Sequence, residues 1–225
     1  MTAETHTHPQ TLRQLVIVGA GGHAVSVANV AQSTVYSVKY FVDKTRNGES
    51  LLGVGIIGDI AELSDLSEFD FAIAVGDNAL RERIYKQLSS QHTGLRFPPL
   101  VHSSATISFF TNVGDGTVVM PNAVVGPNSN LGKFCILNTQ ASIDHDCSMA
   151  DFSSLAPGAI VGGTVHIGSR SAVSIGAVVK HGLTIGDDCV IGANSYLNKD
   201  LPANQVAYGT PAKRIRSRKV GDSYL

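Results

Sequence analysis

The chain of 225 residues is long enough for one or two domains, and its 17 Lys and Arg residues against 18 Asp and Glu residues leave a formal net charge of −1. This balance lacks the basic excess that nucleic-acid binding requires, so no nucleic-acid partner is expected. No stretch approaches the run of about 18 apolar residues that spans a membrane.

Residues 1–11 contain Thr, His and Pro but no apolar centre, which excludes a signal peptide and predicts a flexible leader. Residues 12–18 are typical of a buried strand. Residues 38–42 and 71–75 predict two further strands, with one helix before the second strand and another after the third. Alternating strands and helices favour a small Rossmann-like α/β domain with a parallel sheet over residues 12–97.

A glycine-rich segment, residues 19–24, follows the first strand and matches the dinucleotide-binding pattern G-x-G-x-x-G/A. With Asp43 about twenty residues later, the motif alone indicates NAD. A domain this short has no room for the second half of a dinucleotide fold, however. We therefore expect Gly21, Gly22 and His23 to bind the phosphates of a nucleotide-sugar at a helix N-terminus. The alternative is a tight turn without a ligand.

The second half of the chain is a repeat. Pro98 and Pro99 predict an extended crossing into it. From Val101 to Leu197 every sixth residue is aliphatic or Met, in seventeen hexapeptides without an insertion. A period of six indicates a parallel β-helix, with three hexapeptides in each coil of eighteen residues. We expect this β-helix over residues 98–207 and a tail over residues 208–225.

The position of a residue within the hexapeptide predicts its environment. The aliphatic first slot and the small fifth slot should point inward, and the frequent second-slot glycines should occupy turns. Cys135, Cys147 and Cys189 all fall in the fifth slot. They are therefore expected to be core residues without disulfides, which favours a cytoplasmic location.

Five segments together resemble one protein family. They are Gly-Ala-Gly-Gly-His at 19–23, Asp43, Asn138, His145-Asp146-Cys147, and Gly-Thr-Pro-Ala-Lys-Arg at 209–214. In these the chain is similar to the sialic-acid O-acetyltransferase/bacterial aminosugar N-acetyltransferase family, and the resemblance covers residues 14–216. It implies a left-handed β-helix, a homotrimer with active sites between adjacent β-helices, and acetyl-CoA bound along the coils.

The resemblance implies a catalytic role for His145, as the general base for the attacking amine. Asp146 matches the carboxylate that orients this base, and Asp144 is a rival partner. Gly163 follows His145 by eighteen residues, so the repeat should place it directly above the base. There its backbone N–H can help to bind the acetyl carbonyl.

The remaining site residues are also implied by the resemblance. At Ser154 well-studied relatives carry a His, and a serine can still donate a hydrogen bond but cannot act as an acid. The predicted acetyl-CoA residues are Asn138, Ser154, Gly163, Ile175 and Ala193. The predicted nucleotide-sugar residues are Gly21, Gly22, His23, Asp43, Lys44 and Gly58. The basic residues of the tail stay open between contact with the CoA phosphates and simple solvation.

The predicted reaction is acetylation of the 4-amino group of UDP-2-acetamido-4-amino-2,4,6-trideoxyglucose by acetyl-CoA, giving UDP-di-N-acetylbacillosamine. GDP-perosamine, dTDP-4-amino-4,6-dideoxyglucose and O-acetylation of a sugar are alternatives with the same base. A non-catalytic nucleotide-sugar-binding scaffold is the alternative from another class. No metal is expected, because no two of the histidines in the repeat have the five-residue spacing of the carbonic anhydrases built on this fold.

Overall fold

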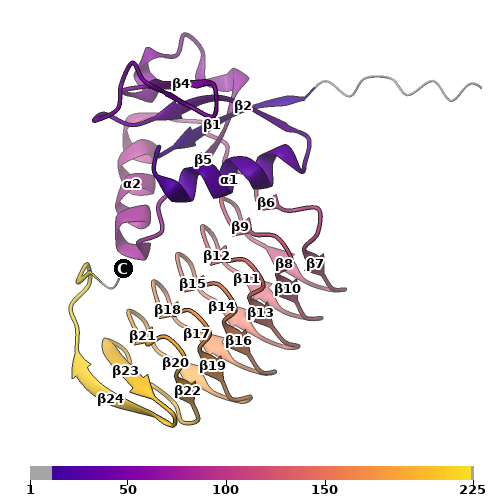
Figure 1. Ribbon diagram of the computed structural model, residues 1–225, viewed down its shortest axis with the longest axis vertical. Coiled ribbons are helices and arrows are strands. Elements are labelled where there is room, and N and C mark those ends of the chain that lie inside the picture. Colours follow the sequence, from indigo (N-terminus) through magenta and orange to yellow (C-terminus); the bar gives the residue numbers. More distant parts are fainter. Residues whose placement is uncertain (1–11, 224–225) are drawn as a thin grey trace, which may run out of the picture.

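The computed structural model describes residues 12–223, so the leader predicted at residues 1–11 lies outside the described part of the chain. Figure 1 shows an α/β domain at one end and a prism of stacked coils below it. The predicted fold class, a small α/β domain followed by a left-handed parallel β-helix, is confirmed. Neither long helix within residues 12–223 combines the length and apolar composition needed to cross a membrane.

The α/β domain contains a five-stranded sheet in the order β3-β4-β2-β1-β5. Its strands are β1 (Arg13–Val18), β2 (Tyr36–Val42), β3 (Ser50–Leu51), β4 (Val54–Ile57) and β5 (Asp70–Ile73). All pairings are parallel except that of β3 with β4. The helices are α1 (Gly22–Gln32), α2 (Asn78–Gln91) and the short 3-10 helices η1 (Ile60–Glu62) and η2 (Leu66–Glu68).

The hairpin of β3 and β4 was not predicted from the sequence. Its turn is formed by Leu52 and Gly53, which both have positive φ, 54° and 77°. Two residues with positive φ make the turn that best joins a tight hairpin, but asparagine or glycine usually occupies the first of them. Because leucine stands there, the turn has no recognisable sequence signal.

The β-helix consists of seventeen two-residue strands on three sides, each a parallel sheet (Figure 1). Side 1 contains β6 (Leu100–Val101), β9 (Val118–Val119), β12 (Ile136–Leu137), β15 (Ser154–Leu155), β18 (Ala172–Val173) and β21 (Val190–Ile191). Side 2 contains β7 (Thr106–Ile107), β10 (Val124–Val125), β13 (Ser142–Ile143), β16 (Ile160–Val161), β19 (Val178–Val179) and β22 (Tyr196–Leu197). Side 3 contains β8 (Asn112–Val113), β11 (Asn130–Leu131), β14 (Ser148–Met149), β17 (His166–Ile167) and β20 (Thr184–Ile185).

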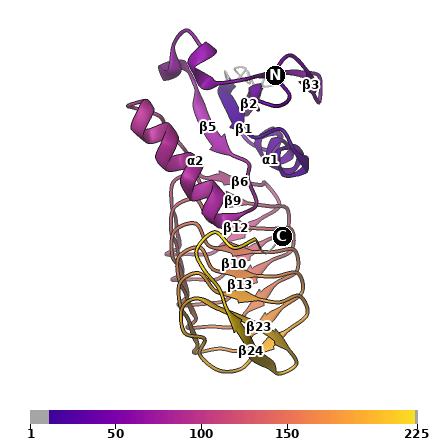
Figure 2. The same ribbon diagram turned by 90° about the vertical axis from the view of Figure 1, so that its left-hand side faces the viewer.

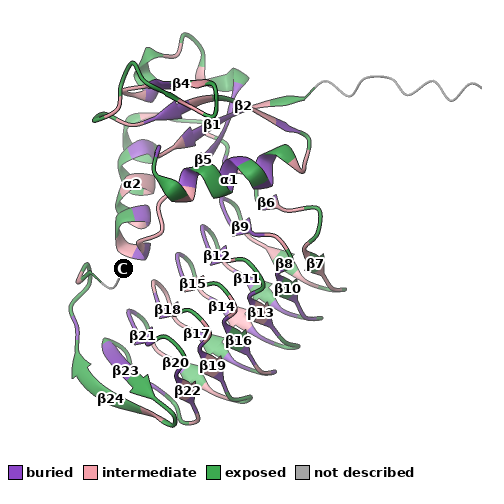
Figure 3. Cartoon of the chain, in the orientation of Figure 1, coloured by how far each residue is buried: buried purple, intermediate pink, exposed green. Residues whose placement is uncertain are grey.

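The chain visits sides 1, 2 and 3 in turn, and we name the corners 1–2, 2–3 and 3–1 accordingly. Strand partners are eighteen residues apart: Ile143 pairs with Val125 and with Val161. The first-slot residues form one continuous core with small fifth-slot residues. All three cysteines are free and buried in or beside this core, as predicted. Figure 3 shows buried residues recurring along every coil.

The turn of each hexapeptide is in the fourth slot, not in the second as predicted. Every sixth residue from Phe110 to Asn194 has a left-handed φ between 53° and 72°. Second-slot glycines have no positive φ; their role is close packing between coils. A Cβ on Gly114 would lie 2.5 Å from the carbonyl oxygen of Gly132 in the next coil. Glycine is required there because any side chain would collide with backbone.

Both ends of the β-helix are covered. On the N-terminal side, Leu100, Val118 and Met120 of the first coils join the core of the α/β domain beneath α1. On the C-terminal side, β23 (Gln205–Gly209) extends side 1 and pairs antiparallel with β24 (Ala212–Ser217). A stack of coils needs such caps, because its terminal sheets would otherwise expose unpaired backbone groups.

Candidate active site

His145 and Asp146 form a hydrogen-bonded pair at corner 2–3. His145 follows β13, and its Nδ1 lies 2.7 Å from Asp146 Oδ2. Asp146 occupies the left-handed fourth slot, with φ of 55°, which turns its side chain back toward the preceding residue. From the coil below, Asn128 Nδ2 donates to Asp146 Oδ1 at 2.5 Å. The carboxylate is therefore held from both sides, and it can fix the orientation of the imidazole.

The rival partner, Asp144, does not contact the imidazole through any recorded hydrogen bond. Its Oδ1 accepts from the backbone N–H of His145 at 2.8 Å. The two carboxylates thus have different contacts: Asp146 pairs with the ring and Asp144 caps the backbone of the same residue.

The hydrogen bond to Asp146 raises the pKa of His145 above its ordinary value. The bonds from Asn128 and His145 lower the pKa of Asp146. About half of each side chain is exposed, 52% for His145 and 45% for Asp146. The pair is thus an imidazole beside a carboxylate that stays ionised, open to a ligand at the corner.

Gly163 lies next to the free nitrogen of this imidazole, as the eighteen-residue register predicts. A Cβ built on Gly163 would lie 2.5 Å from His145 Nε2 and 2.7 Å from Cε1. Only a residue without a side chain leaves the Nε2 of His145 accessible from this coil. No described group accepts a hydrogen bond from the backbone N–H of Gly163, so this N–H is available to a ligand.

Four of the five predicted acetyl-CoA residues line one cavity of about 520 Å³ at side 1 and corner 1–2. They are Asn138, Ser154, Ile175 and Ala193; the fifth, Gly163, does not line it. Ala156 and Ser174 also line the cavity, and they lie eighteen and thirty-six residues after Asn138. The repeat register could have identified both. Tyr208 on β23 also lines it, and no signal in the repeat points to this residue.

His145 and this cavity lie at different corners of the same prism. Asn138 follows a side 1 strand, whereas His145 follows the next strand, on side 2. Asn138 Oδ1 instead accepts from the backbone N–H of Thr139 at 2.8 Å. Within a single chain, Asn138 therefore lies apart from His145.

The predicted nucleotide-sugar residues divide between two places. Asp43, Lys44 and Gly58 lie together at the carboxyl ends of β2 and β4, where they line a cavity of about 300 Å³ against α2. Carboxyl ends of parallel strands are the usual ligand edge of such sheets. Asp43 accepts from both the backbone N–H and the hydroxyl of Thr45, and these bonds lower its pKa.

Gly21, Gly22 and His23 lie at the start of α1, where Gly21 is the N-cap residue. A Cβ on Gly21 or Gly22 would meet nothing within 4 Å, so open space surrounds both glycines. His23 lines the 520 Å³ cavity with the acetyl-CoA candidates rather than the cavity of Asp43. Burial, aided by Arg81, lowers its pKa to about 4, so the imidazole is neutral near pH 7. Its buried Nε2 has no hydrogen-bond partner among residues 12–223.

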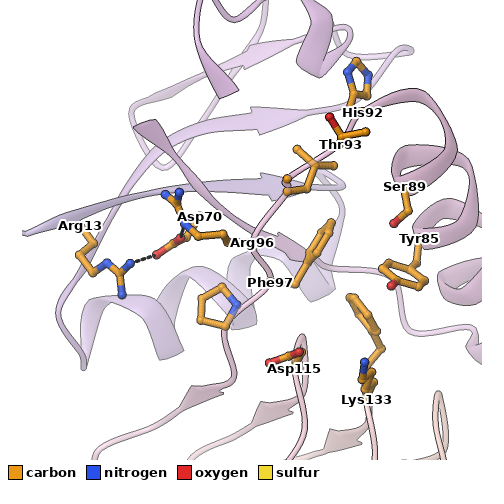
Figure 4. A pocket seen from close by; sticks show the side chains of 14 residues that line it. Arg13, Asp70, Tyr85, Ser89, His92, Thr93, Arg96, Phe97, Asp115 and Lys133 are labelled. Carbon is orange, nitrogen blue, oxygen red and sulfur yellow. Dashed lines mark hydrogen bonds and ion pairs between the residues drawn. The ribbon is translucent and has the colours of Figure 1, made fainter. Parts of the chain in front are cut away.

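A further cavity of about 660 Å³ contains none of the predicted site residues (Figure 4). It lies between the C-terminal half of α2 and the first coils. The buried Asp70 holds Arg96 at 2.7 Å and Arg13 at 3.2 Å on one side. Within residues 12–223, no cluster of three or more His, Cys, Asp or Glu side chains could hold a metal ion.

Two family models match the chain. Residues 14–88 match the PglD N-terminal domain, and residues 164–199 match the bacterial transferase hexapeptide of six repeats. The matches lie in the α/β domain and in the β-helix, respectively.

Solved structures extend the similarity to almost the whole chain. The acetyltransferase domain of PglB from Neisseria gonorrhoeae, in complex with acetyl coenzyme A, is 34% identical; the alignment covers 91% of this chain and 100% of that one, with a TM-score of 0.85. A histidine variant of GDP-perosamine N-acetyltransferase from Caulobacter crescentus, in complex with CoA and GDP-perosamine, is 32% identical, with 91% and 97% coverage and a TM-score of 0.85.

Curated relatives match over shorter segments. Galactoside O-acetyltransferase of Escherichia coli is 57% identical over 35 residues, which are 16% of this chain. The chain spans 24% or less of the length of the curated relatives that it matches.

Proposed function

Since the chain belongs to the sugar N-acetyltransferases of the hexapeptide superfamily, we propose that it transfers the acetyl group of acetyl-CoA to the amino group of a nucleotide-linked sugar. The observation that carries the proposal is the His145–Asp146 pair with Gly163 at its open nitrogen. Acyl transfer to an amine needs a base whose nitrogen the attacking amine can reach. Gly163, which has no side chain, leaves the Nε2 of His145 open for this role.

In the proposed reaction His145 is the general base. The neutral amine attacks the thioester carbonyl, and Nε2 of His145 takes the proton that the new C–N bond makes acidic. The tetrahedral adduct then expels the CoA thiolate, which takes this proton from the His145 imidazolium and leaves as the thiol, so that the neutral base is restored. Asp146 holds Nδ1 and stabilises the imidazolium that forms in between. The backbone N–H of Gly163 is positioned to stabilise the oxyanion.

We propose that each active site needs two subunits of a homotrimer. His145 and the 520 Å³ cavity lie at the two corners that flank side 2. Side 2 also carries apolar outward residues, Val124 at 41% exposure and Ile160 at 49%. If side 2 faces neighbouring copies in a closed ring, corner 2–3 of one subunit meets corner 1–2 of the next. Acetyl-CoA in the cavity of one subunit then reaches His145 of its neighbour.

The acceptor is assigned to the α/β domain. Asp43, Lys44 and Gly58 supply one end of the site, and the start of α1 supplies backbone N–H groups for phosphate. We propose a nucleotide-linked 4-amino sugar, with UDP-2-acetamido-4-amino-2,4,6-trideoxyglucose first. GDP-perosamine is the second candidate, because it is bound to the Caulobacter crescentus relative.

A thiol-release assay with acetyl-CoA tests this function. UDP-2-acetamido-4-amino-2,4,6-trideoxyglucose, GDP-perosamine and dTDP-4-amino-4,6-dideoxyglucose are offered in parallel, and the acetylated product is identified by mass spectrometry. The matching hydroxy sugars serve as controls for O-acetylation. Turnover with an amine and not with its hydroxy counterpart supports the proposal. A purified trimer that binds acetyl-CoA but acetylates none of these sugars would exclude it and favour the non-catalytic scaffold.

A further inference from the structure

Asn78, the first residue of α2, connects the α/β domain to the wall of the acetyl-CoA cavity. It is fully buried, and its Nδ2 donates to Ser154 Oγ at 3.1 Å and to the backbone carbonyls of Arg170 at 3.1 Å and Ser171 at 3.2 Å. Figure 2 shows α2 running from the coils up along the α/β domain. The contact thus joins segments more than seventy residues apart in the chain.

The orientation of the Asn78 amide is fixed by Arg81. Arg81 Nη2 donates to Asn78 Oδ1 at 2.6 Å, so the amide oxygen must face the guanidinium. Arg81 is itself buried; its Nη2 also donates to the carbonyl oxygen of Phe152, and its Nε donates to that of Phe134, one coil before. A flipped amide would place its NH2 group against a donor and its oxygen against carbonyl oxygens. Only the observed orientation places the NH2 hydrogens against acceptors and the amide oxygen against a donor.

This orientation determines what the Ser154 hydroxyl can do. An amide NH2 group is a donor only, so Asn78 cannot accept the hydroxyl hydrogen of Ser154. No other described group accepts it either. Ser154 is half-buried and lines the 520 Å³ cavity together with Ile175 and Ala193. Its hydrogen is therefore available to an acceptor atom inside this cavity.

We propose that Asn78 is a positioning residue that makes Ser154 a hydrogen-bond donor to a carbonyl oxygen of the acyl-pantetheine arm. The inference rests on the proposed function, because acetyl-CoA must occupy this cavity. The arm offers three carbonyl oxygens along its length, one in the thioester and two in the amides. With this role for Asn78, α2 contributes to both cavities. Its first residue positions Ser154, and Gln87 and Gln91 near its other end line the cavity of Asp43.

The test compares two substitutions by calorimetric binding of acetyl-CoA and by KM. Ser154→Ala removes the donor. Asn78→Asp replaces the NH2 group with a carboxylate oxygen, which accepts the Ser154 hydrogen and so withdraws it from the cavity, while Arg81 still pairs with the new carboxylate. Because this oxygen also faces the carbonyl oxygens of Arg170 and Ser171, thermal unfolding must first show that the variant is folded. Each variant should weaken acetyl-CoA binding about threefold to tenfold, the loss expected for one hydrogen bond, with the KM for the acceptor unchanged. The double variant should be no weaker than either single one.

Controls separate this role from a structural one. Ser148→Ala is the matched control: it removes another sixth-slot serine, bonded to His166 at 2.8 Å on side 3, away from the cavity. Ser154→Thr keeps the hydroxyl and should restore binding. Unchanged acetyl-CoA affinity in Ser154→Ala would overturn the proposal, as would an equal rise in both KM values in Asn78→Asp.

Two further measurements keep the outcomes distinct. Binding of CoA without the acetyl group tells which carbonyl is contacted: a loss with CoA indicates a pantetheine amide, and a loss only with acetyl-CoA indicates the thioester. Because acetyl-CoA affinity is measured without an acceptor, failure to find the acceptor sugar would count against the proposed reaction only. If wild-type protein binds neither acetyl-CoA nor CoA, both proposals fail together.

Discussion

The two parts of this molecule encode their sites differently. In the β-helix a residue's slot in the hexapeptide fixes its environment, so His145 and Gly163 can be placed by counting. In the α/β domain, Asp43 and Gly58 meet only because two parallel strands end at the same edge of the sheet. In the repeat, the position of a side chain can therefore be read from the sequence alone. In the α/β domain, the order of the strands in the sheet must be known before two residues can be placed together. Substitutions in the two parts should differ accordingly.

The largest effect is expected from His145→Ala in the β-helix. The kcat should fall about 100- to 10,000-fold, the usual contribution of a general base, because Nε2 no longer takes the proton. Acetyl-CoA affinity and thermal stability should remain near wild type, since the imidazole is half exposed. Steady-state kinetics measures the fall in kcat, and calorimetry measures acetyl-CoA affinity and thermal stability. An active His145→Ala enzyme would remove the catalytic assignment from corner 2–3.

Two glycines of the repeat should separate activity from stability. Gly163→Ala places a methyl group against His145 Nε2 and should lower kcat/KM about 100-fold through misplacement of the reacting groups. Gly114→Ala collides with the backbone of the next coil instead, and this overpacking should lower the free energy of unfolding by about 1–3 kcal/mol. The kcat/KM of each variant is measured at a temperature where both are folded, and their free energies of unfolding are compared separately. The prediction fails if Gly114→Ala is the less active of the two.

In the α/β domain, Asp43→Ala should act on the acceptor alone. Loss of a hydrogen bond that involves this carboxylate should raise the acceptor KM about 10- to 100-fold, while the KM for acetyl-CoA stays unchanged. Asp65→Ala is the matched control, because Asp65 also accepts from a nearby backbone N–H but lines no described site cavity. A similar rise in the control variant would mean that loop structure, not contact with the nucleotide, causes the effect.

The pH dependence should report the His145–Asp146 pair. Because the hydrogen bond raises the pKa of His145, the neutral base is lost as pH falls through a value above its ordinary 6.5, and kcat/KM should decline there. Asp146→Asn removes the negative charge, so the acid limb of the profile should move to lower pH. An acid limb at the same pH in both enzymes would mean that another group titrates.

The smallest effect is expected from replacing exposed glutamines with glycine. Gln140 has a left-handed φ of 59° in a fourth slot, so glycine relieves backbone strain there and stability should change by only a few tenths of a kcal/mol. Gln87 lies within α2, where glycine should cost about 1 kcal/mol. Thermal unfolding of both variants gives the comparison. Equal losses would contradict the view that the fourth slot is the turn.

The sequence predicted the β-helix well because its period is unbroken, and the same register positions Gly163 and buries Cys135. It failed where a contact depends on another segment. The second-slot glycines were assigned to turns, although packing of one coil on the next requires them. Tyr208 reaches the acetyl-CoA cavity from β23, outside the repeat, and the Leu52-Gly53 turn has no typical residue pair. The contact of Asn78 with Ser154 depends on docking of the two parts, which no local pattern encodes.

The separation of His145 from the acetyl-CoA cavity has a genetic consequence. In the proposed ring, an inactive His145→Ala chain still carries an intact cavity, and an inactive cavity variant such as Ala193→Trp still carries an intact histidine. Co-expression of the two should restore activity, because about one quarter of the subunit boundaries in randomly mixed rings unite both intact halves. Two alleles that each give an inactive enzyme would then restore activity when expressed in one cell. Two variants that both damage the histidine corner, or both damage the cavity, would restore none.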